Sequence, residues 1–200
     1  MKIQGFDPLP KKILGWNGDS PIFKELIDQV KPKTIIEVGS WYGMSTITMA
    51  KACSPETKIY CVDTWLGSYE FIAMEDEERW NRMLKHGYPQ AYYQFLSNII
   101  HEGVVDKIEV IPTTSENAVP HLPQADLIYI DGQHTYKGVK EDLENYYPKL
   151  NNGGVIFGDD YFIKEIGDIP INVGGAVDDF AKKNNLKVEI YYKNFWAIKK

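Results

Sequence analysis

Five predicted β-strands of this chain end in polar residues that could bind or activate a ligand. Glu37 and Gly39 mark the end of the first predicted strand, and Asp63 marks the end of the second. The other three strands run into Thr113-Thr114-Ser115, Asp131-Gly132-Gln133-His134 and Asp159-Asp160. In an open sheet of parallel strands, ligands bind beyond the carboxyl ends of the strands. Because crowded carboxylates repel one another, this pattern favours a binding site that uses them.

The segment TIIEVGSWYG, residues 34–43, predicts a strand that passes through a glycine turn into a helix. Glu37 lies near the end of the strand, and the turn contains Gly39, Ser40 and Gly43. Such a turn presents backbone N–H groups and the positive end of a helix to a polar part of a nucleotide-like ligand. The spacing E-x-G-x-x-x-G differs from the G-x-G-x-x-G of dinucleotide-binding folds. An ordinary strand-to-helix turn is the alternative interpretation.

Asp63 follows Gly39 by 24 residues and is a candidate ligand of a ribose diol, since one carboxylate accepts two hydroxyl hydrogen bonds. The alternative is that Asp63 caps a turn. Aromatic residues just after the first two strands could line the wall of the same pocket. These residues are Trp41, Tyr42, Trp65 and Tyr69.

Three carboxylates, Asp131, Asp159 and Asp160, follow two of the predicted strands and form a candidate metal site. Close carboxylates remain charged together only if a cation or raised pKa values relieve their repulsion. Oxygen ligands favour magnesium or calcium over zinc. His134 lies three residues after Asp131 and could take a proton from a hydroxyl held at the metal. The alternative is structural, with the aspartates capping turns and His134 an ordinary loop histidine.

Strand-like and helix-like segments alternate, which predicts an α/β fold with a doubly wound, Rossmann-like sheet and helices on both faces. The seven predicted strands are 34–38, 58–62, 108–111, 126–130, 155–158, 187–192 and 195–199. The sheet is expected to be mostly parallel, with an antiparallel C-terminal hairpin turning at Lys193-Asn194. Helices are predicted at about 21–30, 44–53, 70–85, 90–101, 139–146 and 174–184, and a turn at Asn151–Gly154.

The 200 residues predict a single domain, 1–200, with an N-terminal extension at 1–18. Residues 64–107 are too long for a simple connection and predict a helical insertion, which either covers the substrate or packs as a plain structural element. A net charge of −6 without a lysine- or arginine-rich stripe argues against a nucleic-acid partner. No apolar run approaches a membrane span, and the N-terminus lacks a secretion signal. We therefore expect a cytoplasmic protein, with Cys53 and Cys61 reduced and buried.

Four motifs, in this order, resemble a class I S-adenosylmethionine-dependent methyltransferase. They are IIEVGSWYGMST, KIYCVDTW, PTTSENAVPHLP and DLIYIDGQHTYKGVKEDLENYYPKLNNGGVIFGDDY, and the closing pair of strands completes the pattern. Within that class, IDGQHTY followed by GDDY is similar to the branch that includes metal-dependent O-methyltransferases of antibiotic sugars such as those of macrolides. We expect a shorter protein than those enzymes, without their long extra N-terminal region, so the resemblance leaves the acceptor and the oligomeric state open.

The resemblance implies S-adenosylmethionine as the cofactor and Mg²⁺ as the metal. The cofactor-binding residues that it implies are Glu37, Gly39, Ser40, Gly43, Asp63, Ser115 and Asp131. It further implies Asp131, Asp159 and Asp160 as metal ligands and His134 as the catalytic base, while the acid typical of the family before Ser115 is Thr114 here. The expected reaction is metal-assisted O-methylation of a hydroxylated small molecule or glycan, and homo-oligomerisation is left open. The residues themselves also leave open a metal-dependent hydrolase or lyase, or a nicotinamide oxidoreductase, on the same fold.

Overall fold

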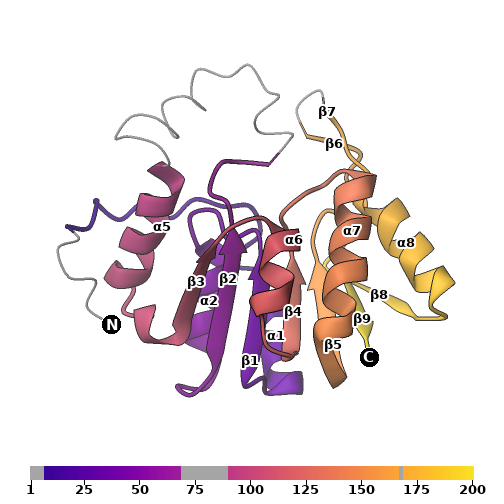
Figure 1. The fold of residues 1–200 in the computed structure, drawn as a ribbon, viewed down its shortest axis with the longest axis horizontal. Coiled ribbons are helices and arrows are strands. Elements are labelled where there is room, and N and C mark those ends of the chain that lie inside the picture. The colour runs from indigo at the N-terminus through magenta and orange to yellow at the C-terminus, as the bar shows by residue number, and fades with distance from the viewer. Residues whose placement is uncertain (1–6, 69–89, 167–168) are drawn as a thin grey trace.

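A seven-stranded sheet runs through the middle of the protein (Figure 1). The structure, a computed structural model, describes residues 7–68, 90–166 and 169–200. The strands are β1 Thr34–Val38, β2 Lys58–Asp63, β3 Ile108–Pro112, β4 Ala125–Ile130, β5 Leu150–Gly158, β8 Val188–Tyr191 and β9 Phe195–Lys199. Their order is β3-β2-β1-β4-β5-β9-β8, with β1 to β5 parallel and β9 and β8 antiparallel. This arrangement confirms the predicted fold class.

Helices cover both faces of the sheet. One layer contains α1 Pro21–Val30, α2 Met44–Ala52 and α5 Gln90–His101, and the other contains α6 Ser115–Ala118, α7 Tyr136–Tyr146 and α8 Val173–Lys183. Single turns of 3-10 helix occur at Val105–Lys107, Val119–His121 and Tyr147–Lys149. A small second sheet, β6 Glu165–Ile166 and β7 Ile169–Pro170, lies beyond the carboxyl ends of the parallel strands (Figure 1).

The alternation of side chains along β1 explains why the protein has a core on each side of the sheet. Successive side chains of a strand point to opposite faces. Ile35 therefore joins the core beneath α1, α2 and α5, while Ile36 joins the core beneath α6, α7 and α8. On the first face Phe23 of α1 meets Tyr129 of β4 edge to face, with ring centroids 5.0 Å apart. A strand covered on both faces must be apolar on both, which is the pattern of a parallel sheet.

Two predicted turns differ from the structure. Residues 151–154 were expected to form a turn, but they belong to β5. Gly153 N–H donates to the carbonyl of Lys200, and Lys200 N–H donates to that of Gly154, so the C-terminus extends the ladder along this glycine pair. The C-terminal hairpin turns through three residues, 192–194, rather than two, and Tyr192 and Lys193 both have positive φ.

The N-terminal segment 7–18 forms no helix or strand, and side chains of α5 hydrogen-bond to its backbone. The side chain of Asn98 accepts from Lys12 N–H at 3.0 Å and donates to the carbonyls of Lys12 and Tyr42 at 2.9 and 2.8 Å. Leu9 N–H donates to the hydroxyl of Ser97. Helix α5 thus fixes the segment on its way to the carboxyl edge of the sheet. The helix predicted at 70–85 lies outside the described residues.

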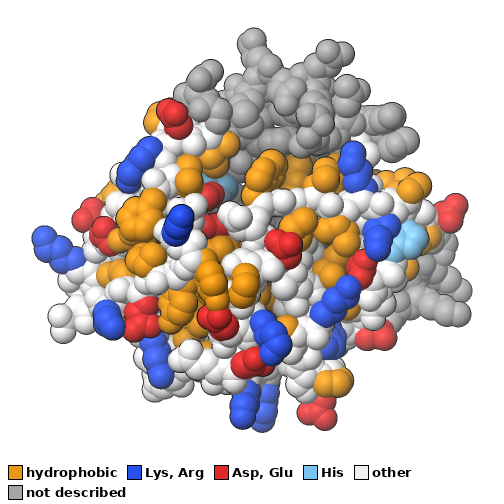
Figure 2. All heavy atoms as spheres, turned by 180° about the vertical axis from the view of Figure 1, so that it is seen from behind, with side chains coloured by type: hydrophobic (Ala, Val, Ile, Leu, Met, Phe, Trp, Pro, Cys, Tyr) orange, Lys and Arg blue, Asp and Glu red, His pale blue; other side chains and the backbone are white. Residues whose placement is uncertain are grey.

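The surface mixes both signs of charge. Figure 2 shows Lys and Arg side chains interspersed with Asp and Glu side chains on the face opposite to that of Figure 1. None of the helices in the described ranges is long and apolar enough to cross a lipid bilayer. Cys53 and Cys61 are free and buried, as predicted.

Candidate active site

A cavity of about 790 Å³ opens at the carboxyl edge of the sheet. Its volume is in the range of sites that enclose small molecules and cofactors. Loops that follow all five parallel strands line the cavity. This agrees with the prediction that the polar residues at the strand ends lie at one edge of the sheet. The predicted site residues on its wall are Gly39, Ser40, Asp63, Ser115, Asp131, His134, Asp159 and Asp160. The structure therefore brings these eight residues together, although they span the chain from position 39 to position 160.

The glycine turn after β1 packs directly against the loop after β4. Gly39 has φ +92°, and a Cβ on this residue would lie 2.2 Å from the carbonyl oxygen of Asp131. Backbone hydrogen bonds fix the approach, since Gly39 N–H donates to Val62 and Asp131 N–H donates to Val38. Gly43, at φ +88°, precedes the first residue of α2. The close contact of the two loops requires glycine at position 39.

Glu37 lies behind the turn rather than in the cavity wall. Its side chain is fully buried, and its carboxylate accepts hydrogen bonds from the hydroxyls of Ser40 and Ser45, both at 2.6 Å. The hydroxyl of Thr46 is a third donor. Burial raises the pKa of Glu37, and the three hydroxyls oppose that rise. Glu37 therefore orders the turn and the start of α2 from within the core.

Asp63 both caps a turn and lines the cavity. Its carboxylate accepts from the N–H groups of Trp41 at 2.8 Å and Trp65 at 2.6 Å. Burial raises the pKa of Asp63, while these backbone hydrogen bonds lower it. Of the four aromatic residues expected at the pocket, Trp41 lines it. Tyr42 and Trp65 are buried in the core, so that prediction was wrong for them, and Tyr69 lies outside the described residues.

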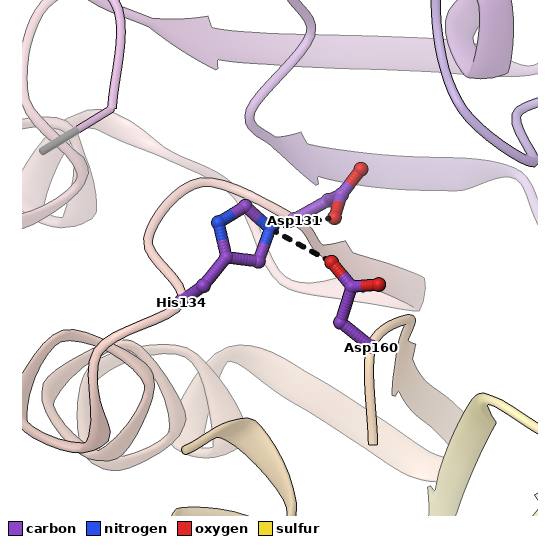
Figure 3. Close-up of side chains that lie close together, drawn as sticks. All are labelled: Asp131, His134 and Asp160. Atoms are coloured by element: carbon purple, nitrogen blue, oxygen red, sulfur yellow. Dashed lines mark ion pairs between the residues drawn. The ribbon is translucent and has the colours of Figure 1, made fainter. Parts of the chain in front are cut away.

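Asp131, His134 and Asp160 form a compact cluster in the cavity (Figure 3). Nε2 of His134 lies 3.5 Å from Oδ1 of Asp131 and 3.3 Å from Oδ2 of Asp160. Tyr129 donates its hydroxyl proton to Oδ2 of Asp131 at 2.9 Å. Burial is the main cause of the raised pKa of Asp131, which His134 opposes. The imidazole ring therefore lies between the carboxylates of Asp131 and Asp160.

The carboxylate of Asp159 contacts different partners. It accepts from Nδ2 of Asn17 at 2.9 Å and from the N–H of Asp160 at 2.7 Å. Burial raises the pKa of Asp159. Potential metal-binding atoms of Asp131, His134 and Asp160 all lie within 4.8 Å of one another. Asp159 is not part of this group. The carboxylates of Asp131 and Asp160 at this spacing could offer oxygen ligands to a small divalent cation, and the ligand role of Asp159 stays a prediction.

Sequence reasoning missed two contributors to the cavity. Residues 14–18 of the predicted extension line it, and Trp16 among them is 71% exposed. The Asn17-Gly18 pair just before a helix start was the available signal, since such pairs form turns. The second is Asp142 of α7, which is 2% exposed. Its position three residues after Val139, on the apolar face of that helix, marks it as a buried acid.

A protein-family model described as "Methyltransferase domain" matches residues 36–161. The matched region begins in β1, before the glycine turn, and ends just after Asp160. It therefore contains every residue of the acid–histidine cluster.

Two curated relatives and one solved structure illustrate the similarity. The protein y4gI of Sinorhizobium fredii is 30% identical over 155 residues, which cover 76% of this chain and 16% of that protein. The 8-demethyl-8-(2,3-dimethoxy-alpha-L-rhamnosyl)-tetracenomycin-C 4'-O-methyltransferase of Streptomyces olivaceus is 27% identical over 147 residues, 68% of this chain and 56% of that enzyme. The chain thus spans only part of both. The O-methyltransferase TomG of Streptomyces achromogenes, solved in complex with S-adenosylmethionine, shares the fold with a TM-score of 0.62, 14% identity and coverage of 94% and 80%.

Proposed function

The chain belongs to the methyltransferase-domain family, as the order of its motifs indicated, and we propose that it transfers a methyl group from S-adenosylmethionine to a hydroxyl group of a small molecule or glycan. One observation carries the proposal. The glycine turn, Asp63 and the acid–histidine cluster all line the same cavity. Family membership favours methyl transfer over the hydrolase, lyase and oxidoreductase alternatives.

The donor would occupy the part of the cavity next to β1 and β2. Gly39 and Ser40 of the glycine turn line that part and would face the methionine portion, and Asp63 offers a carboxylate to the ribose hydroxyls. Ser115 follows β3, the strand beside β2, and so lies on the side where the base of the nucleoside would extend. This order along the strand ends supports a nucleoside-containing ligand across the cavity.

The acceptor would occupy the part next to β4 and β5, where the cluster lies. S-adenosylmethionine supplies an already activated methyl group, so the residues of the chain must mainly orient an acceptor oxygen and exclude water. His134 would accept the hydroxyl proton at Nε2, and Asp131 and Asp160 would stabilise the resulting charge. A divalent cation held by Asp131 and Asp160 would supply Lewis acidity toward the acceptor oxygen.

The acceptor class rests on two further points. The Streptomyces olivaceus relative is named for methylation of a hydroxyl on a rhamnosyl sugar. In this chain the exposed indole of Trp16 stands at the cavity, and an aromatic face suits a sugar ring or a flat aromatic acceptor. A hydroxylated ring compound agrees with both.

Methyl transfer can be tested by measuring S-adenosylhomocysteine release in the presence of rhamnosides and catechols, with and without Mg²⁺. We expect His134→Gln to lower kcat by about 10²–10⁴-fold, the usual loss for a general base, while S-adenosylhomocysteine affinity stays within about threefold. Asp179→Asn is the control, because Asp179 is an exposed residue of α8 that accepts a hydrogen bond from Tyr136 and does not line the cavity. A wild-type protein that does not bind S-adenosylhomocysteine in calorimetry would refute the proposal.

The metal is tested separately by titrating Mg²⁺ into wild type and into an Asp159→Asn/Asp160→Asn variant. Loss of Mg²⁺ binding with retained S-adenosylhomocysteine binding is the expected result, because the donor residues lie at other strand ends. Equal Mg²⁺ binding by both proteins would remove the metal from the mechanism.

A further inference from the structure

A buried carboxylate on α7, Asp142, lines the cavity outside the acid–histidine cluster. The side chain is only 2% exposed, yet the residue lines the cavity. Its Oδ2 atom is buried and has no hydrogen-bond partner among the residues that the structure describes. A buried oxygen without a donor costs free energy, so such an atom is expected to meet a donor when the cavity is filled.

Ser115, the first residue of α6, is the polar neighbour of Asp142. Burial raises the pKa of Asp142, and the hydroxyl of Ser115 opposes that rise. Tyr146, one turn after Asp142 on α7, donates its hydroxyl proton to the carbonyl of Ser115 at 2.8 Å. The Tyr146 bond ties α7 to α6, and Oδ2 of Asp142 is still able to accept a hydrogen bond.

The position of this carboxylate relative to Asp63 indicates which part of a ligand it would meet. Asp63 pairs with Pro112 in the register of β2 and β3, and Ser115 follows three residues later. Asp63 is the residue that we assign to the ribose. A base attached to that ribose would extend toward Thr113, Ser115 and Asp142, which line the same cavity.

We propose that Oδ2 of Asp142 accepts a hydrogen bond from the exocyclic 6-amino group of the donor's adenine and thereby selects adenine over a 6-oxopurine. The inference rests on the proposed function, because it assigns a contact to the donor of that reaction. The 6-amino group is a hydrogen-bond donor, which is what an acceptor-only carboxylate requires.

The charge state of Asp142 agrees with this role. Burial raises its pKa to about 6, and the hydroxyl of Ser115 opposes the rise. At about pH 7.5 the group is mostly ionised and can only accept. A 6-oxopurine would place its carbonyl oxygen against this carboxylate, and two buried acceptors facing each other disfavour binding.

The test compares the binding of S-adenosylhomocysteine and S-inosylhomocysteine, which carries a 6-oxo group, by calorimetry at about pH 7.5. Wild type should prefer the adenosyl compound by at least about tenfold, the size expected for one hydrogen bond to a charged group. In Asp142→Asn the amide can turn its N–H₂ toward the oxo group, so the preference should fall by about tenfold or more. Glu141→Gln is the matched control, since it removes a charge at the adjacent, solvent-exposed position and should keep the wild-type preference.

The outcomes separate the two proposals. If wild type binds the adenosyl and inosyl compounds with equal affinity, the inference is overturned without any variant. The inference is also overturned if a folded Asp142→Asn protein prefers the adenosyl compound as strongly as wild type does. That second result is expected if a water molecule, rather than the base, donates to Oδ2. Failure of wild type to bind either compound overturns the proposed function and the inference with it. Circular dichroism and urea unfolding of both variants establish that they are folded.

Discussion

Gly39→Ala is the substitution for which the structure gives the clearest prediction. Two separate penalties arise at this position. The backbone is at φ +92°, where a residue with a Cβ is strained, and the new Cβ would lie 2.2 Å from the carbonyl oxygen of Asp131. It would also lie 2.7 Å from Cα of Gly132. Since Cβ atoms do not approach other atoms closer than 3.0 Å, the two loops must separate.

The magnitude follows from these two effects. A left-handed conformation costs a residue with a Cβ roughly 1–2 kcal/mol. Forcing two packed backbone segments apart costs about a further 1–3 kcal/mol, by analogy with an overpacked core. We therefore expect Gly39→Ala to lower the free energy of unfolding by about 2–5 kcal/mol. Displacement of Asp131 should also weaken S-adenosylhomocysteine binding, because both loops line the cavity.

Urea unfolding followed by circular dichroism measures the first effect, and calorimetry with S-adenosylhomocysteine measures the second. Gly103→Ala is the matched control. Gly103 also has positive φ, +69°, but a Cβ there would meet nothing within 4 Å. The control should therefore lose only the roughly 1–2 kcal/mol of backbone strain and keep full affinity. Equal destabilisation by the two substitutions would show that the contact between Gly39 and Asp131 is not as tight as the structure has it.

Two further predictions concern stability. Burial raises the pKa of Asp142 from 3.8 to about 6. The contribution of the protonated Asp142 side chain to the free energy of unfolding is therefore greatest below about pH 4 and is lost as pH rises through 6. Urea unfolding of the ligand-free protein from pH 4 to 7 should show wild type losing about 2 kcal/mol relative to Asp142→Asn, and a pH-independent difference would contradict this account. Asn98→Ala removes three buried hydrogen bonds to the backbone of Lys12 and Tyr42. It should cost about 2–3 kcal/mol and expose residues 7–18 to limited proteolysis, whereas unaltered proteolysis would mean that other contacts attach this segment.

The positions of most strands and helices were predictable because each depends on nearby residues. The strand, glycine turn and helix start at 34–44 are encoded by a short run of mostly apolar, β-branched residues and by glycines that tolerate positive φ. The boundaries that failed depend on distant partners. Gly153 and Gly154 pair with the distant Lys200 as part of β5, and no local signal in Asn-Asn-Gly-Gly reports this pairing.

The sequence by itself determined the family, the sheet with its polar strand ends and the types of residue gathered there. Parallel strands carry their carboxyl ends to one edge whatever their exact register, so convergence of Asp63, Asp131 and Asp160 followed from order along the chain. Tertiary structure alone decided which atoms meet. Asn17 donates to Asp159 across 142 residues of chain, and Asp142 reaches the cavity from the apolar face of a helix. Such contacts depend on how helices and loops pack in three dimensions, which residue spacing does not specify.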